Sequence, residues 1–219
     1  MLFDVDGTLV DTNYLHTLAW SRALRDVGEW APMNAIHRLI GMGGDQLVPQ
    51  LVGREIPEAH DARARRYREV LGEARAFPGA ADLLRTVHDA GLVVILATSS
   101  PADEVAALRE LIGADDVIDG QITADDVEAS KPAPDVFLTA MQVGNVHPDA
   151  AIAVGDSKWD IQAARAAGIG CIGLESGGFS QHELAEAGAL HVYRDAEELK
   201  HQVRTSPLAT LLQAARSVG

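Results

Sequence analysis

The sequence has one cysteine, few aromatic residues and no long apolar run, and these scarcities exclude whole classes of protein. Cys171 has no partner within the chain, so a disulfide-stabilised scaffold is excluded. It lies in the apolar run 169–174, which favours a packing role. No stretch approaches the roughly 20 apolar residues of a membrane span, and no signal peptide precedes the first strand. We therefore expect a cytoplasmic protein with no membrane partner.

Positive charge is also scarce. The 219 residues include 18 Lys and Arg against 32 Asp and Glu, a formal net charge of -14. Such a surface repels polyanions, so nucleic acid and anionic membranes are not expected partners. The expected partner is a small molecule, and the expected state is a monomer or weak dimer. The length suits one domain of about 150 residues with an insert.

Hydrophobic patterning divides the chain into two parts. Residues 12–79 follow a helical period, with one apolar face early in the segment that contains Leu15, Leu18, Ala19, Ala23 and Leu24. Further helices are expected near 35–40 and 45–52 and over 57–76. Residues 1–11 and 80–219 instead alternate apolar strands with helices, which indicates an α/β fold with a parallel sheet covered on both faces. Expected strands are 1–5, 92–97, 150–154, 170–174 and 190–193, and expected helices are 102–111, 134–143 and 160–167.

Charge differs between the two parts. Residues 12–79 hold 9 Lys and Arg against 8 Asp and Glu, a net of +1, whereas the rest holds 9 against 24, a net of -15. An anionic ligand bound between them would need cations from a metal or from the insert. The densest source is the run from Arg63 to Arg68. We favour a solvated helix face for this run, with pairs such as Arg65 with Glu69, over a ligand-binding role.

The most informative motif is a pair of carboxylates near the start of the chain. Asp4 and Asp6 follow a short apolar strand and, being two residues apart, point the same way at its carboxyl end. Like charges so close persist only with a cation or a shared proton. Gly7 allows a tight turn and Thr8 adds a hydroxyl. A plain strand with an Asx turn would explain one aspartate but not both.

Three further polar motifs follow other predicted strands. Thr98 and Ser99 place hydroxyls and free amides before a helix, an arrangement that binds anions. Lys131 precedes a proline-initiated helix and can project from a stiff loop. Asp156 ends a strand, and Asp160 returns a second carboxylate one helical turn later. Each motif alone is weak or moderate, but in this order the four are far more specific.

Together these residues resemble the haloacid dehalogenase superfamily of phosphohydrolases. The resemblance spans nearly the whole chain, through Asp4 to Thr8, Thr98, Lys131 with its following proline, and Asp156 with Asp160. It implies a Rossmann-like, doubly wound core over 1–11 and 80–219, with 12–79 as a mobile helical cap. One departure is the first strand, which has fewer apolar residues than the family usually shows.

The resemblance also implies catalytic roles. Asp4 would attack phosphorus and form an aspartyl-phosphate, which divides one hard displacement into two easier ones. Asp6 would protonate the leaving oxygen and then deprotonate water. Thr98 and the amide of Ser99 would bind phosphoryl oxygens, and Lys131 would offset charge on the phosphate and on Asp4.

A magnesium site follows from the same resemblance. Asp4, a backbone carbonyl expected at Asp6, and Asp156 would hold Mg²⁺, with waters completing an octahedron. Asp160 would belong to this metal site by orienting a metal-bound water or Lys131.

The expected activity is therefore a Mg²⁺-dependent phosphatase acting on a small phosphorylated metabolite of the sugar phosphate or phosphoglycolate type. Asp6 favours phosphoryl transfer over carbon-halogen cleavage, because true dehalogenases lack this second aspartate. Candidate substrate-contacting residues are Ser99, with His16, Gly44 and Arg63 from the cap. The first alternative is a β-phosphoglucomutase-like mutase, which the glycine-rich turn 41–47 disfavours, because the mutases carry an arginine there. The second is a non-catalytic binding protein on the same fold.

Overall fold

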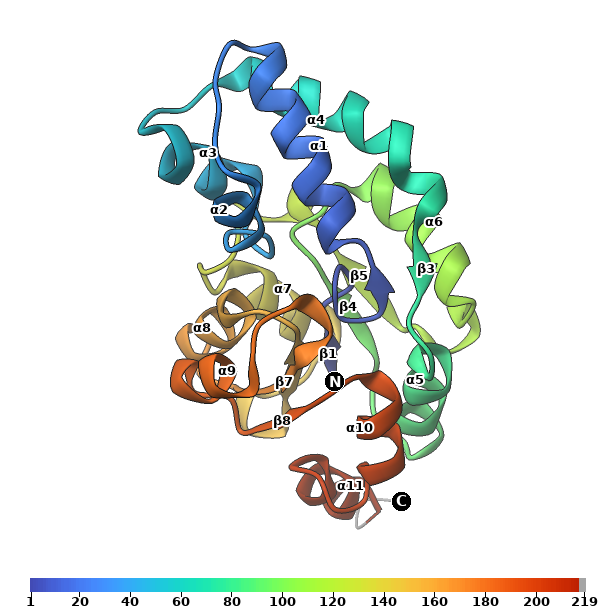
Figure 1. Cartoon of the computed structure of the whole chain (residues 1–219). Coiled ribbons are helices and arrows are strands. Elements are labelled where there is room, and N and C mark those ends of the chain that lie inside the picture. The colour runs from blue at the N-terminus through green and yellow to red at the C-terminus, as the bar shows by residue number, and fades with distance from the viewer. Residues whose placement is uncertain (217–219) are drawn as a thin grey trace.

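A computed structural model describes residues 1–216 and places a parallel sheet at the centre of the larger part of the molecule (Figure 1). Within these residues the sheet has six strands in the order β5-β4-β1-β6-β7-β8. The strands are β1 (Leu2–Phe3), β4 (Ile95–Ala97), β5 (Gly120–Ile122), β6 (Ile152–Gly155), β7 (Gly170–Leu174) and β8 (His191–Tyr193). The last three residues of the predicted core, 217–219, lie outside the described residues.

Helices cover both faces of this sheet, and neighbouring residues of a strand pack into two separate hydrophobic cores. Phe3 packs with apolar residues of α5 (Ala80–Asp89), α6 (Ala102–Ile112), α10 (Ala196–Gln202) and α11 (Leu208–Arg216). Leu2 packs instead with residues of α7 (Asp135–Val143), α8 (Lys158–Ala166) and α9 (Gln181–Ala187). Successive strand residues point to opposite faces, so a sheet with two apolar faces must be covered twice. The predicted doubly wound α/β fold is confirmed, and Cys171 is buried in the second core.

The segment between β1 and α5 is largely helical, as predicted. It forms α1 (Asn13–Asp26), α2 (Met33–His37), α3 (Gly44–Val52) and α4 (Pro57–Val70), which stand together at the end of the molecule opposite α11 (Figure 1). These helices bury an apolar cluster of their own, which includes Trp20, Leu24, Ile36 and Leu47. We refer to residues 12–79 as the insert. Its status as a separate domain stays a prediction.

One prediction of local structure was wrong, and several elements were not expected. The helix expected over 57–76 ends at Val70, and a short 3₁₀ turn (Leu71–Glu73) leads to β3 (Arg75–Ala76). This strand pairs antiparallel with β2 (Val10–Asp11), so the chain enters and leaves the insert at adjacent positions. The edge strand β5 was not expected, because its sequence Gly-Gln-Ile is short and only partly apolar. The helices α5, α9, α10 and α11 were also not expected.

Among residues 1–216, no helix combines the length and apolar character needed to cross a membrane.

The two-sided core predicts unequal effects for two leucine truncations. Leu83 is fully buried on α5, whereas Leu138 on α7 is 41% exposed. Leu83→Ala should lower the free energy of unfolding by about 2–5 kcal/mol, because it removes buried methyl groups and leaves a cavity. The matched change Leu138→Ala should lower it by less than about 1 kcal/mol. Urea unfolding followed by circular dichroism measures both, and similar losses would contradict the assignment of Leu83 to the core.

Candidate active site

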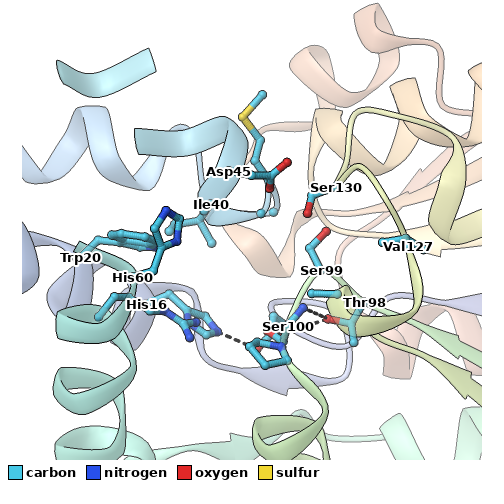
Figure 2. Close-up of a pocket in the computed structure, with 18 of the residues that line it drawn as sticks. His16, Trp20, Ile40, Asp45, His60, Thr98, Ser99, Ser100, Val127 and Ser130 are labelled. Atoms are coloured by element: carbon cyan, nitrogen blue, oxygen red, sulfur yellow. Dashed lines mark hydrogen bonds and ion pairs between the residues drawn. The ribbon is translucent and has the colours of Figure 1, made fainter. Parts of the chain in front are cut away.

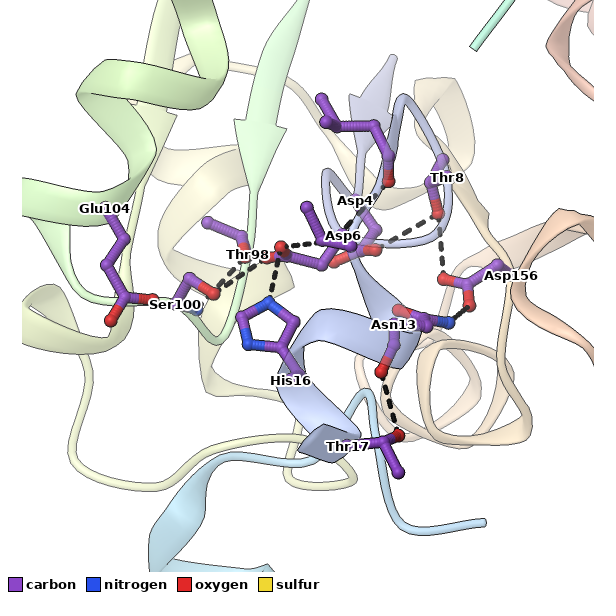
Figure 3. Close-up of polar contacts among 12 residues, drawn as sticks. Asp4, Asp6, Thr8, Asn13, His16, Thr17, Thr98, Ser100, Glu104 and Asp156 are labelled. Atoms are coloured by element: carbon purple, nitrogen blue, oxygen red, sulfur yellow. Dashed lines mark hydrogen bonds and ion pairs between the residues drawn. The ribbon is translucent and has the colours of Figure 1, made fainter. Parts of the chain in front are cut away.

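Four buried carboxylates gather at the carboxyl edge of the sheet, and Figure 3 shows Asp4, Asp6 and Asp156 among them. Asp4 and Asp6 follow β1, Asp156 follows β6, and Asp160 lies in the first turn of α8. Each has a relative exposure of 8% or less. Strands β1 and β6 are parallel neighbours, so their ends bring residues 152 positions apart in the sequence to one edge. This edge is where open α/β sheets bind ligands.

Three of these carboxylates form a compact oxygen cluster. Asp4, Asp156 and Asp160 each offer an oxygen, and the three oxygens lie within 4.8 Å of one another. The hydroxyl of Thr8 lies between two of them, 3.0 Å from Asp4 Oδ2 and 3.0 Å from Asp156 Oδ1. The amide of Asn13 donates to Asp156 Oδ2 at 2.8 Å. A set of hard, buried carboxylate oxygens fits a small divalent cation.

The Lys131 ammonium is buried among these carboxylates. Lys131 is fully buried, and its Nζ lies 2.6 Å from Asp4 Oδ1 and 2.7 Å from Asp160 Oδ1. It also donates to the Ala97 carbonyl at 3.0 Å. Burial alone would lower the pKa of Lys131, but the charges of Asp160 and Asp4 outweigh burial and raise it, so the ammonium stays charged. The sequence prediction that Lys131 lies against Asp4 agrees with this geometry.

Asp160 is fixed by its own helix terminus. Its Oδ2 accepts hydrogen bonds from the Ser157 amide at 3.1 Å and the Ser157 hydroxyl at 2.5 Å, which completes a capping box at the start of α8. The other oxygen, Oδ1, is the one that meets Lys131. Asp160 therefore orients the lysine in this structure.

The carboxylate cluster carries more negative charge than its protein partners offset. Burial, the largest cause, raises the pKa of Asp4, and the neighbouring Lys131 only partly opposes this effect. Burial and the charges of Asp160 and Asp4 raise the pKa of Asp156. A bound divalent cation would offset this excess of negative charge and keep both groups ionised. The residues present therefore fit a metal ion.

Asp6 lies in a different environment from Asp4. Its carboxylate oxygens are within hydrogen-bond distance of the hydroxyls of Thr12 (2.7 Å), Thr98 (3.2 Å) and Ser100 (2.7 Å), and of His16 Nε2 (2.8 Å) (Figure 3). Burial would raise the pKa of Asp6, but the contact with His16 and the hydrogen bonds from the hydroxyls hold it well below its usual range. The two aspartates of one motif are thus placed in opposite electrostatic settings.

His16 connects Asp6 to the insert. Arg63 Nη2 lies 2.6 Å from His16 Nδ1, and the same guanidinium forms an ion pair with Glu104 of α6. Arginine has only donors, so Nδ1 must accept, the proton sits on Nε2, and His16 donates to Asp6. The His16 ring also stacks on Tyr67, with centroids 4.2 Å apart. A continuous polar chain therefore runs from the sheet through two helices of the insert and back to α6.

This contact corrects the sequence interpretation of the cationic run. We expected a solvated helix face, but the Arg63 side chain is only 11% exposed and is held by Glu104. The carboxylate of Glu69 is paired with Arg66 and Arg22 rather than with the expected Arg65. The sequence could not reveal the Glu104 pair, because its members are 41 residues apart.

A cavity of about 370 Å³ opens beside the carboxylates (Figure 2). The sheet contributes Asp4, Asp6, Ser130 and the run 98–100 to its walls, and the insert contributes His16, Trp20, Gly44, His60 and Arg63 among others. The Ser99 hydroxyl is buried and has no hydrogen-bond partner within the described residues. Buried polar groups normally have a hydrogen-bond partner, so this hydroxyl marks an unusual point of the cavity wall.

Gly44 lines this cavity for a steric reason. A Cβ added there would lie 2.7 Å from the His60 ring and 2.9 Å from the Trp20 ring. A Cβ at Gly43 would lie 2.1 Å from the Ser130 hydroxyl of the facing loop. The glycines therefore let this turn of the insert approach both walls, and a direct contact of Gly44 with substrate stays a prediction.

Several residues at this site were missed by sequence reasoning. Thr12 and Ser100 hold Asp6, Asn13 holds Asp156, and Glu104 holds Arg63. Thr12 and Asn13 could have been found, because they follow the first motif closely and begin a helix. Ser100 is adjacent to the second motif. Nothing in the local sequence singles out Glu104.

Comparison with known proteins agrees with this geometry. The family model for haloacid dehalogenase-like hydrolases matches residues 1–168. The chain belongs to this family. Among curated haloacid dehalogenase-like relatives, phosphoglycolate phosphatase of Pseudomonas putida is 32% identical over 188 residues, which cover 81% of this chain and 69% of the relative.

Solved structures of this hydrolase family show the same fold. A hydrolase from Pseudomonas syringae is 34% identical with a TM-score of 0.88, and the match covers 93% of this chain and 97% of that one. CbbY from Rhodobacter sphaeroides, in complex with xylulose 1,5-bisphosphate, is 30% identical with a TM-score of 0.75. That match covers 90% of this chain and 94% of CbbY.

The close approach of Gly177 to Asp156 provides a test of the oxygen cluster. A Cβ at Gly177 would lie 1.6 Å from Asp156 Oδ2, so Gly177→Ala must displace that carboxylate. We expect about 10–100-fold weaker binding of Mg²⁺, measured by isothermal titration calorimetry, with a circular dichroism spectrum like that of the parent. Gly72→Ala is the matched control, because no heavy atom lies within 4 Å of its added Cβ. Unchanged Mg²⁺ affinity in Gly177→Ala would remove Asp156 from the proposed metal site.

Proposed function

We propose that this hydrolase is a Mg²⁺-dependent phosphatase that cleaves a small phosphorylated metabolite through an aspartyl-phosphate on Asp4. The observation that carries the proposal is the pairing of two buried aspartates, Asp4 beside Lys131 and the oxygen cluster, and Asp6 beside three hydroxyls and His16. Relatives in the same family that are named as phosphatases support it.

Asp4, Asp156 and the backbone carbonyl of Asp6 would hold the metal. When bound, Mg²⁺ supplies positive charge beside the phosphoryl oxygens and keeps the nucleophilic carboxylate ionised. Asp160 would act on this group indirectly, through Lys131. The hydrogen bonds from Ser157 hold the Asp160 carboxylate in the orientation that meets Lys131.

The attack itself needs a carboxylate aimed at phosphorus. Lys131 holds Asp4 Oδ1 and Thr8 lies beside Oδ2, so the side chain is held from both sides. An Asp4 oxygen forms the new bond to phosphorus while the bond to the leaving oxygen breaks, and Lys131 offsets charge on the transferring group. Thr98 and Ser99 at the cavity wall would bind the phosphoryl oxygens.

Asp6 would transfer the protons in both steps, the attack of Asp4 on phosphorus and the hydrolysis of the aspartyl-phosphate. In this structure its hydrogen bonds favour the ionised form. A phosphate dianion arriving beside it raises its pKa, since like charges disfavour each other, and so promotes uptake of a proton. That proton passes to the leaving oxygen, and the regenerated carboxylate then takes one from the water that attacks the aspartyl-phosphate.

The cavity limits the substrate to a small metabolite. Its volume of about 370 Å³ lies near the lower end for small-molecule sites. The insert covers the reacting groups, so bulk water is excluded while the phosphoryl group is transferred. The phosphoglycolate and carbohydrate phosphatases among its relatives support a substrate of the phosphoglycolate or sugar phosphate type.

Replacement of the nucleophile tests the proposed reaction. Asp4→Asn should abolish release of phosphate from an aryl phosphate, because an amide cannot form the phosphoryl ester. EDTA should stop the parent enzyme, and added Mg²⁺ should restore it. Asp89→Asn, at an exposed aspartate of α5, is the matched control and should retain full turnover. Phosphate release by Asp4→Asn at the parental rate would refute Asp4 as nucleophile.

The mutase alternative is tested by its product. Isomerisation through a bisphosphate needs a second cationic clamp, and Arg63 is already paired with Glu104. We therefore expect β-glucose 1-phosphate to yield glucose and free phosphate, detected by coupled assays for each product. Formation of glucose 6-phosphate at a comparable rate would establish the mutase instead.

A further inference from the structure

The charged residues that line the cavity are mostly negative. Asp4, Asp6, Asp45 and Glu128 contribute carboxylates, and Arg63 contributes the one guanidinium among the described lining residues. Asp4 and Asp6 belong to the proposed reaction. Asp45 and Glu128 have no part in it, and both are exposed residues of the cavity lining.

The cations near the cavity are already committed. Arg63 uses Nη1 for Glu104 and Nη2 for His16, and its remaining Nε is buried without accessible surface. Lys131 is fully buried and bound between Asp4 and Asp160. These groups serve one phosphoryl group and its nucleophile, and neither offers a free donor to a second anionic group.

Asp45 and Glu128 are the two exposed carboxylates of the cavity lining. Asp45 lies in the first turn of α3, across the cavity from Ser130 and Ser99 (Figure 2). Its Oδ2 accepts a hydrogen bond from Gln46, and no ion pair of Asp45 or Glu128 occurs within the described residues. Unpaired carboxylates repel a second negative charge and accept hydrogen bonds from hydroxyl or amino groups.

The rest of the wall suits a polyol. The Ser130 hydroxyl lies on the facing loop of the cavity lining, and Trp20 packs edge-on to His60 with centroids 5.6 Å apart. Hydroxyl donors and acceptors beside an aromatic ring can bind both the polar groups and the C–H faces of a carbohydrate-like chain.

We propose that Asp45 and Glu128 determine specificity, so that the cavity selects phosphate monoesters whose organic part carries hydroxyl or amino groups and no second negative charge. This inference rests on the proposed phosphatase function and narrows its substrate class to the sugar phosphate type, because phosphoglycolate carries a carboxylate as a second negative charge. We therefore expect this protein to disfavour a bisphosphate such as the one bound to CbbY.

Glycerol 3-phosphate and 3-phosphoglycerate test the proposal, because they differ chiefly in a terminal CH₂OH or carboxylate. The parent enzyme should favour glycerol 3-phosphate by about tenfold or more in kcat/KM, mainly through KM, since two nearby charges act on the carboxylate. The double variant Asp45→Asn, Glu128→Gln should reduce this ratio about tenfold. Glu110→Gln, which removes an exposed charge outside the cavity lining, should leave the ratio as it is. High salt should also reduce the ratio of the parent enzyme.

Binding to the Asp4→Asn variant separates this inference from the proposed reaction. Calorimetry with that variant should show tighter binding of glycerol 3-phosphate than of 3-phosphoglycerate. Adding Asp45→Asn and Glu128→Gln to that variant should remove the difference in affinity. Equal affinity for the two esters, or a ratio that survives the double variant, would overturn the inference even if phosphate is released. A preserved affinity difference with no phosphate release by the parent would refute the phosphatase and still support the selectivity.

Discussion

The ion pairs of Lys131 are the constraint on which the rest of this site depends. A fully buried ammonium is stable only if carboxylates surround it, and here Asp4 and Asp160 do so at 2.6 and 2.7 Å. Such a cluster gains little stability over apolar packing, since desolvation opposes the Coulomb attraction. Stability therefore does not account for this cluster, whereas the proposed chemistry does. The cluster fixes the direction of Asp4 and leaves the remaining negative charge to be offset by a cation.

The insert contacts the proposed catalytic groups as well as covering them. His16 donates to Asp6, Arg63 fixes the tautomer of His16, and Glu104 of α6 holds Arg63. The hydrogen bonds on Asp6 thus depend on the position of the insert, so a displacement of helices α1 and α4 would remove the donor that stabilises its ionised form. Placement of the insert and the protonation of Asp6 are physically coupled.

The sequence was most informative where local patterns determine position. Asp4 and Asp156 follow apolar strands, and parallel strands end at one edge, so their meeting could be predicted without coordinates. The pairing of Arg63 with Glu104 could not, because helical periodicity describes a face and not what packs against it. The end of α4 was missed for a similar reason: Arg75 belongs to a strand that exists only because it pairs with Asp11.

The distribution of charge is the basis of the proposed selectivity for one phosphate over a second anion. The chain has a net charge of -14, so an anionic metabolite gains little from long-range attraction. Binding must instead rely on short-range groups, and we propose that Lys131 and the metal beside Asp4 provide them. Toward the solvent, the exposed carboxylates of Asp45 and Glu128 add negative charge. In the proposed complex this distribution orients the ester, because the phosphoryl end is favoured beside the cations and the uncharged end beside the outer carboxylates.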